Sequence, residues 1–406
     1  MSAQLIKGGV TTPAGFVAAG VYCGIKKPTH AHPLDLCLIA STSGPVPAAA
    51  VFTTNLAVAA PVVVSREHLT RAGGLCAGAV VNSGCANAVT GEAGMAVAKG
   101  MAGAAAEALG VSDEFIFVSS TGVIGVPLSL TKVRAGITAA KAALSVDGND
   151  NATTAIMTTD PFPKSCAAYV DTPKGRVTVG GITKGSGMIE PRMATMLGFL
   201  TTDAKVAPDV LQIALRRICD ETFNAITVDG ECSTNDCVLL MASGASGVEI
   251  TDPSDPALVE PLRAVAGHLA REIVRGGEGA TKLVTIRVTG AASLDDARLG
   301  ARTIANSPLV KTAIHGGDPN WGRLIAAAGR SGAHFVLDHA SVKIGDIDLF
   351  VNGVPFDERA DAAATVLQGK EMVITVDLGT GGAHEATMWT CDFSKEYVTI
   401  NAEYRT

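Results

Sequence analysis

The spacing of apolar residues along the chain predicts three helices of different character. Four apolar residues recur at helical intervals, which favours a helix over about 207–222 with one buried face: Leu211, Leu215, Ile218 and Phe223. The segment 256–275 carries a similar stripe, formed by Leu258, Leu262, Val265, Leu269 and Ile273. Residues 91–109 are mostly small, and they predict a helix that ends at Gly110.

Short apolar runs predict strands between the helices. Residues 115–118 form one such strand, which leads into a turn of small residues at 119–125. Further strands are predicted near 176–182, 195–202, 236–242, 282–288, 343–351, 372–378 and 385–390, and further helices near 131–144, 294–305, 321–328 and 359–367. This alternation predicts a mixed α/β or α+β fold and leaves its topology open.

Composition narrows the classes of function. The chain of 406 residues is 47% hydrophobic with only 4% aromatic residues, so we expect a large core packed from small side chains. A net charge of −7 argues against a nucleic-acid-binding surface and against a polybasic membrane patch. No apolar stretch predicts a signal peptide or a membrane span, and we therefore expect a cytoplasmic protein.

The nine cysteines are scattered and do not predict a disulfide framework. Cys232 and Cys237 are separated by four residues, a spacing that two metal ligands can have, but no second pair or nearby histidine completes the set of four that zinc prefers. We interpret them as ordinary thiols and expect no metal.

The residues that carry candidate chemistry lie in the run KGSGMIEPRMATMLGFLTTD, residues 184–203. Cleavage between Ala194 and Thr195 would free the α-amine of Thr195, which can act as the base for the hydroxyl of the same residue. The upstream Gly185–Gly187 segment would allow the backbone to bend, and the small side chain of Ala194 leaves room for hydroxyl attack on its carbonyl. The alternative is that Thr195 is only a β-branched residue at the start of a strand.

A covalent acyl intermediate requires donors that stabilise the developing oxyanion. The small residues 120–122, after a predicted strand, are the candidate segment, because glycine lets a backbone N–H approach a ligand closely. An ordinary strand-to-helix turn is the alternative interpretation of the same residues.

Ordered sequence blocks throughout the chain resemble those of the ornithine acetyltransferase (glutamate N-acetyltransferase) family. The blocks lie at 81–88, 119–125, 155–160, 184–203, 229–236, 277–282, 307–313, 317–323 and 401–406. The resemblance implies an enzyme of arginine biosynthesis that moves acetyl from N²-acetylornithine to glutamate. It also implies a four-layer αββα sandwich like that of N-terminal nucleophile hydrolases, with a smaller second domain.

The same resemblance assigns roles to individual residues. Thr195 would be the nucleophile, and Thr121 and Gly122 would form the oxyanion hole. The substrate-contacting positions would be Thr158, Lys184, Thr195, Glu278, Asn401 and Thr406. For each contact residue the alternative is a solvated surface position, most clearly for Lys184 and Glu278. His315 is interpreted as structural, because the freed amine already supplies a base.

The resemblance further implies two chains after cleavage, an α chain of residues 1–194 and a β chain of residues 195–406, interleaved in one core and assembled as an α2β2 heterotetramer. No organic cofactor is expected, and whether acetyl-CoA is a second acetyl donor stays open. Two alternatives remain: an N-terminal nucleophile amidase or aminopeptidase, which would pass the acyl group to water, and an uncleaved binding or scaffold protein.

Overall fold

The computed structural model describes residues 2–30, 32–190 and 196–403, and it divides the chain into two compact units. The first unit is formed mainly by residues 1–224 and 232–273, and the second by residues 225–231 and 274–405. Within the described ranges no helix combines the length and the apolar character needed to cross a membrane.

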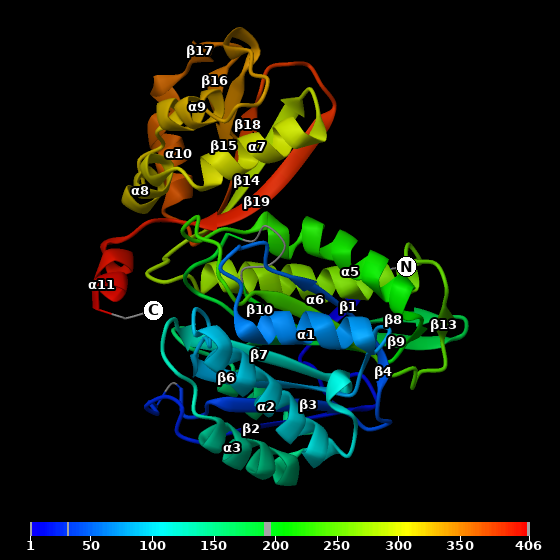
Figure 1. The fold of residues 1–406 in the computed structure, drawn as a ribbon. Coiled ribbons are helices and arrows are strands. Elements are labelled where there is room, and N and C mark those ends of the chain that lie inside the picture. Colours follow the sequence, from blue (N-terminus) through cyan, green and yellow to red (C-terminus); the bar gives the residue numbers. More distant parts are fainter. Residues whose placement is uncertain (1, 31, 191–195, 404–406) are drawn as a thin grey trace. The chain divides into compact units, whose positions relative to one another are not determined.

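Two sheets form the centre of the first unit (Figure 1). The larger has the order β1 (Gln4–Ile6), β8 (Lys164–Thr172), β9 (Gly175–Lys184), β10 (Leu197–Thr202), β12 (Cys237–Ala242), β4 (Val46–Phe52), β5 (Leu75–Cys76). The smaller has the order β2 (Phe16–Val21), β3 (Leu36–Ser41), β6 (Gly78–Cys85), β7 (Ile116–Val123). Two short strands, β11 (Lys205–Val206) and β13 (Glu249–Ile250), pair separately.

The two sheets face each other across a core to which both contribute buried residues, among them Ile39 and Val81 from the smaller sheet and Phe199 and Leu239 from the larger. A second core lies between the outer face of the smaller sheet and α1 (Ala60–Arg71), α2 (Gly91–Leu109) and α3 (Leu130–Ala143). On the outer face of the larger sheet lie α5 (Pro208–Glu221) and α6 (Pro256–Arg275), while α4 (Asn149–Ala155) packs on β2 and β3. The order helix, sheet, sheet, helix is the predicted αββα sandwich.

The second unit is a smaller α/β domain, as predicted. Its sheet has the order β17 (Val354–Pro355), β16 (Ile347–Val351), β15 (Ser341–Ile344), β18 (Glu371–Asp377), β14 (Leu283–Ala291), β19 (His384–Cys391). Its helices are α7 (Leu294–Ala305), α8 (Pro308–Gly316), α9 (Trp321–Gly329), α10 (Ala360–Leu367) and α11 (Lys395–Glu403).

Several element predictions are confirmed closely. Helix α2 ends where Gly110 adopts a left-handed φ of 70°, and α6 buries all five residues of its predicted stripe. Two predictions are wrong. The expected strand at 343–351 is a hairpin of β15 and β16 that turns at Gly345, φ 59°. The segment 119–125, expected to be a turn, is strand up to Val123. Its polar residues fit in the core because the hydroxyls of Ser119 and Ser120 form hydrogen bonds with Cys237 and Asn82.

Candidate functional site

Lys184 and Thr121 meet where the two sheets of the first unit face each other. Lys184 is the last residue of β9 and is paired in register with Leu197, whose side chain is buried in the intersheet core. Residues paired across antiparallel strands share one face, so the Lys184 side chain points toward the smaller sheet. There its Nζ donates a hydrogen bond of 3.2 Å to Oγ1 of Thr121 on β7. The structure therefore brings together two residues that lie 63 positions apart.

Gly122 lies at a bulge in the pairing of β6 with β7. The register shifts where Gly84 pairs with Gly122 and Cys85 pairs with both Thr121 and Val123. Gly122 has a φ of 125°, and a β-carbon there would lie 2.4 Å from the carbonyl carbon of Gly84. A bulge disrupts the hydrogen-bond ladder and re-aims the backbone next to it, which is the local geometry that an oxyanion-binding N–H requires.

Asp160 fixes the segments that carry Thr158 and Lys184. Its buried carboxylate accepts hydrogen bonds from the backbone N–H of Thr158 at 3.1 Å and of Gly185 at 2.7 Å, and it pairs with Lys164 Nζ at 2.6 Å. Burial alone would raise the pKa of Asp160, but the ammonium groups of Lys164 and Lys184 and the hydrogen bonds from Lys164 and Gly185 hold the pKa below its ordinary value. A charged, fully bonded Asp160 thus positions two of the predicted substrate contacts.

Lys26 is a second cation close to this site. Its Nζ donates to Ser83 Oγ at 2.9 Å and to the carbonyl of Met157 at 2.7 Å, directly before Thr158. Burial lowers the pKa of Lys26 to about 8, an effect opposed by Asp35 and Asp160 and reinforced by Lys184. The buried Asp35 carboxylate holds the Lys26 loop by accepting three backbone N–H groups, those of Cys23, Ile25 and Lys26.

Sequence reasoning missed Asp160, Lys164 and Lys26. Asp160 lies inside the recognised block 155–160, and the polar residues Asp160 and Lys164 beside the apolar strand β8 were an available signal. Lys26 has no comparable signal, because its position depends on contacts with residues more than 50 positions away.

The segment before the predicted cleavage point is only partly described. Ser186 is fully buried, and its hydroxyl contacts Thr159 Oγ1 at 2.6 Å, so this position is held rather than flexible. The backbone bends over residues 186–188, partly within the predicted segment, and Met188 is a non-glycine residue with a left-handed φ of 55°. Ala194 and Thr195 lie outside the described residues, and Met196 follows with its carbonyl accepting the N–H of Cys237 at 3.0 Å.

Two of the predicted contacts, Glu278 and Asn401, lie together in the second unit. Asn401 Nδ2, on α11, donates to Glu278 Oε2 at 2.9 Å. Glu278 is 8% exposed, so the alternative of a solvated surface glutamate is wrong for it. Burial raises the pKa of the neighbouring Tyr397, and the negative charges of Asp229 and Glu278 raise it further. The cluster therefore contains two acidic side chains, those of Asp229 and Glu278. Thr406 lies outside the described residues.

His315 has a partner that fits its structural interpretation. Its Nδ1 lies 2.6 Å from Oδ2 of Asp392, and the same carboxylate accepts the backbone N–H groups of Thr281 and Lys282. The contact ties the end of α8 to the chain that follows β19.

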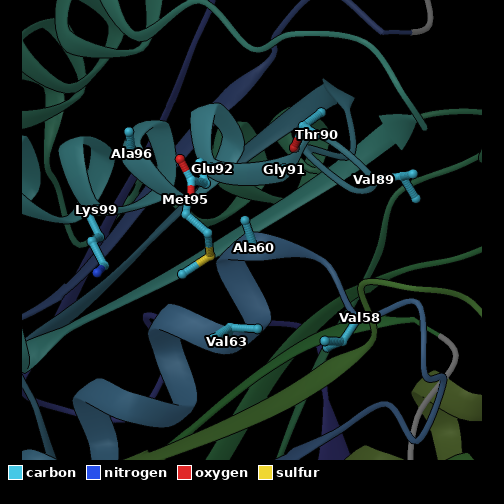
Figure 2. A pocket seen from close by; sticks show the side chains of 10 residues that line it. All are labelled: Val58, Ala60, Val63, Val89, Thr90, Gly91, Glu92, Met95, Ala96 and Lys99. Carbon is cyan, nitrogen blue, oxygen red and sulfur yellow. The ribbon is translucent and has the colours of Figure 1, made fainter.

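A separate pocket of about 600 Å³ lies beside α1 and the start of α2 (Figure 2). Its lining is mostly apolar and consists of Val58, Ala60, Val63, Val89, Thr90, Gly91, Glu92, Met95, Ala96 and Lys99. None of the predicted site residues lines it, so it is not the site that the sequence blocks indicate.

Comparison with known proteins identifies the family. The ArgJ family model matches residues 17–406. The arginine biosynthesis bifunctional protein ArgJ of Symbiobacterium thermophilum is 53% identical over 408 residues, covering 99% of this chain and 100% of that protein. The protein of the same name from Chlorobaculum tepidum is 48% identical over 395 residues, covering 97% of this chain and 96% of that protein.

Among solved structures, the crystal structure of arginine biosynthesis bifunctional protein argJ from Bacillus halodurans is 42% identical, with a TM-score of 0.50. The match covers 52% of this chain and 100% of that chain. The predicted enzyme class, an acetyltransferase of arginine biosynthesis, is confirmed by these matches. The chain therefore belongs to the ArgJ family, the ornithine acetyltransferase family that its sequence blocks resemble.

Proposed function

We propose that the chain cleaves itself between Ala194 and Thr195 and then transfers acetyl from N²-acetylornithine to glutamate through an acetyl ester on Thr195. The observation that carries the proposal is the Lys184–Thr121 contact, because Lys184 is paired in register with Leu197, two residues after Thr195. The predicted nucleophile is thus covalently tied to the strand end where the predicted oxyanion and substrate-binding residues meet.

Two observations are compatible with cleavage into chains 1–194 and 195–406. Strand β10 pairs with β9 on one side and β12 on the other, so the two products would stay joined by a continuous sheet. The solved relative matches 52% of this chain over its own full length, and residues 195–406 are about the same share. We further propose that the two chains assemble as an α2β2 heterotetramer in the cytoplasm, which native mass spectrometry would test.

The reaction begins with the free α-amine of Thr195, whose ordinary pKa of about 7.7–8.0 leaves a large neutral fraction at working pH. The amine removes the hydroxyl proton, Oγ attacks the acetyl carbonyl, and Thr121 and Gly122 stabilise the oxyanion. The carbon–nitrogen bond of the intermediate then breaks, the α-ammonium of Thr195 gives its proton to the departing nitrogen, and ornithine leaves behind the acetyl ester. Glutamate then attacks the ester through the same steps in reverse, which gives ping-pong kinetics.

Substrate recognition follows from charge. Lys184 suits the α-carboxylate that donor and acceptor share, and Thr158 would supply a hydrogen bond. Buried Glu278, with Asn401, suits the side-chain ammonium of ornithine. Thr406 would add a hydrogen bond. No cofactor takes part in these steps, and the word bifunctional in the relatives' names favours acetyl-CoA as a second acetyl donor.

One experiment separates this function from an aminopeptidase or amidase. The purified protein is incubated with N²-acetylornithine, with and without glutamate, and ornithine and N-acetylglutamate are quantified. We expect stoichiometric N-acetylglutamate only when glutamate is present. Release of acetate at the same rate with and without glutamate would favour the hydrolase. If neither acetyl transfer nor acetate release is detected, the binding-protein alternative would be favoured. Thr195→Ala is the matched control and should be uncleaved and inactive.

A further inference from the structure

Asp236 is a buried carboxyl group that the proposed transfer reaction does not use. It is 2% exposed, and its Oδ2 has no hydrogen-bond partner in the part of the chain that the structure describes. Native structures rarely leave a buried polar atom unsatisfied, because burial removes the hydrogen bonds to water without replacing them. Such an atom calls for a functional explanation.

The backbone around Asp236 contacts Met196, which follows the proposed cleavage site, and its neighbour contacts the strand that carries Thr121. Cys237 N–H donates to the carbonyl of Met196 at 3.0 Å, so Asp236 lies beside the residue that follows Thr195. The preceding Asn235 donates through Nδ2 to the carbonyls of Ala86 and of Ser120, directly before Thr121. Thr53 N–H donates to the carbonyl of Asp236 itself. The backbone of Asp236 is therefore fixed beside the start of β10, and its neighbour Asn235 contacts the oxyanion strand.

Burial favours the neutral form of this carboxyl group. Burial raises the pKa of Asp236 well above its ordinary value, and this effect outweighs the hydrogen bond from Ser233 and the positive charge of Lys184. An acid proton on a rigid, buried carboxyl group beside Met196 is available to a basic atom formed nearby.

We propose that Asp236 donates the proton to the Thr195 nitrogen when the Ala194–Thr195 peptide bond breaks, a role in maturation that rests on the proposed self-cleavage. Thr195 Oγ bonds to the Ala194 carbonyl carbon, and the tetrahedral intermediate expels the nitrogen as that carbon–nitrogen bond breaks. The nitrogen takes the Asp236 proton and becomes the α-amine. The proton lost by Oγ restores the carboxyl group, and water then hydrolyses the ester to the Ala194 carboxylate and the Thr195 hydroxyl.

The test is a time course of cleavage in freshly synthesised chains, followed by intact mass. Asp236→Asn keeps the size and polarity of the side chain but has no acid proton, so we expect cleavage to slow by about 10²–10⁴-fold, the usual contribution of a general acid. Asp203→Asn is the matched control. Asp203 is also a buried carboxyl whose pKa is raised by burial, but it lies beyond the opposite end of β10. Its variant should cleave at the wild-type rate.

Asp236→Glu, which retains an acid, should cleave faster than Asp236→Asn and keeps the test valid if the asparagine variant folds poorly. Wild-type cleavage rates in a folded Asp236→Asn variant, or equal rates in the Asn and Glu variants, would overturn the role of Asp236 while leaving self-cleavage intact. A wild-type chain that never cleaves would instead overturn the proposed maturation as a whole.

Discussion

At the scale of single residues, the Thr121 hydroxyl connects the oxyanion strand to the substrate-binding lysine. It accepts the 3.2 Å hydrogen bond from Lys184 and lies directly before the bulge at Gly122. Its loss would misplace Lys184 and remove a polar group from the proposed oxyanion hole.

We predict that Thr121→Val, which keeps the β-branched shape, lowers kcat for acetyl transfer by about 10²–10³-fold, the usual cost of one oxyanion donor. Steady-state kinetics with N²-acetylornithine and glutamate would measure it. Thr121→Ser restores the hydroxyl and should recover most of the rate. Equal kcat values for the valine and serine variants would exclude the hydroxyl from the reaction.

The pKa of Lys26 predicts how the stability of the protein depends on pH. Its pKa is about 8 in the folded protein against an ordinary value of 10.5, so between these pH values the unfolded chain binds more protons than the folded one. Stability therefore gains from Lys26 as pH rises through this interval. The thermal midpoint of the wild type, relative to that of Lys26→Met, should rise from pH 8 to pH 10.5.

The exposed Lys174, in the turn between β8 and β9, is the matched control, since Lys174→Met removes a lysine without disturbing buried contacts. A difference in thermal midpoint between wild type and Lys26→Met that stays constant from pH 8 to pH 10.5 would contradict the lowered pKa of Lys26.

At the scale of elements, the Asp160–Lys164 pair joins the start of β8 to the end of β9. Both side chains have no exposed surface, and removing one partner of a buried pair leaves an uncompensated charge. We predict that Lys164→Met destabilises the protein by about 3–5 kcal/mol in denaturant unfolding. The double variant Asp160→Asn/Lys164→Met should cost less than the sum of the two single changes.

The Asp160–Lys164 pair also predicts that the stability of the folded protein falls at acidic pH. Because the folded pKa of Asp160 lies below its unfolded value, its stabilising contribution is present above the unfolded pKa and is lost as pH falls through the folded pKa. Unfolding curves at acidic pH should therefore converge for the wild type and the double variant, and parallel curves would speak against an ionised Asp160.

The bulge at Gly122 makes a second element-scale prediction. Gly122→Ala would place a β-carbon 2.4 Å from backbone and also demand a φ of 125°, so we expect lower thermal stability and lost activity. Gly125→Ala is the control, because its left-handed φ of 77° is strained but no atom lies within 4 Å of a β-carbon there. Equal thermal midpoints for the two variants would show that the close approach to Gly84 is relaxed.

The sequence predicted those elements whose signal is local. Helix α6 has a clean apolar stripe, and α2 has a glycine at its end. Helix α1 was missed because its run of Pro61, Val62, Val63 and Val64 favours strand by side-chain shape, while contacts with β7 and α2 decide for helix. The strand through 119–123 was missed because its polar residues find partners only in the folded core.

Most candidate site residues could be named only because family blocks marked them, although residues 120–122 were also proposed from their place after a strand. Thr121, Lys184, Glu278 and Asn401 were named from such blocks, and the structure pairs them as Lys184 with Thr121 and Asn401 with Glu278. Asp35, which holds the Lys26 loop, and Asp160, which holds Gly185, act through tertiary hydrogen bonds that no sequence period encodes.

At the scale of the whole molecule, the order of strands explains how the two proposed cleavage products can remain associated. Strand β10 lies inside the seven-stranded sheet, with β9 from before the proposed cut on one side and β12 from after it on the other. Strand β4, from the first part of the chain, pairs with the far side of β12. Chains 1–194 and 195–406 would thus alternate within a single sheet.

The most direct test of the account is an intact-mass spectrum of the active protein after incubation with N²-acetylornithine in the absence of glutamate. We predict two chains, with the second beginning at Thr195 and heavier by one acetyl group that is lost when glutamate is added. An active preparation that consists of one uncut 406-residue chain, or that carries acetyl only on residues before Thr195, would contradict it.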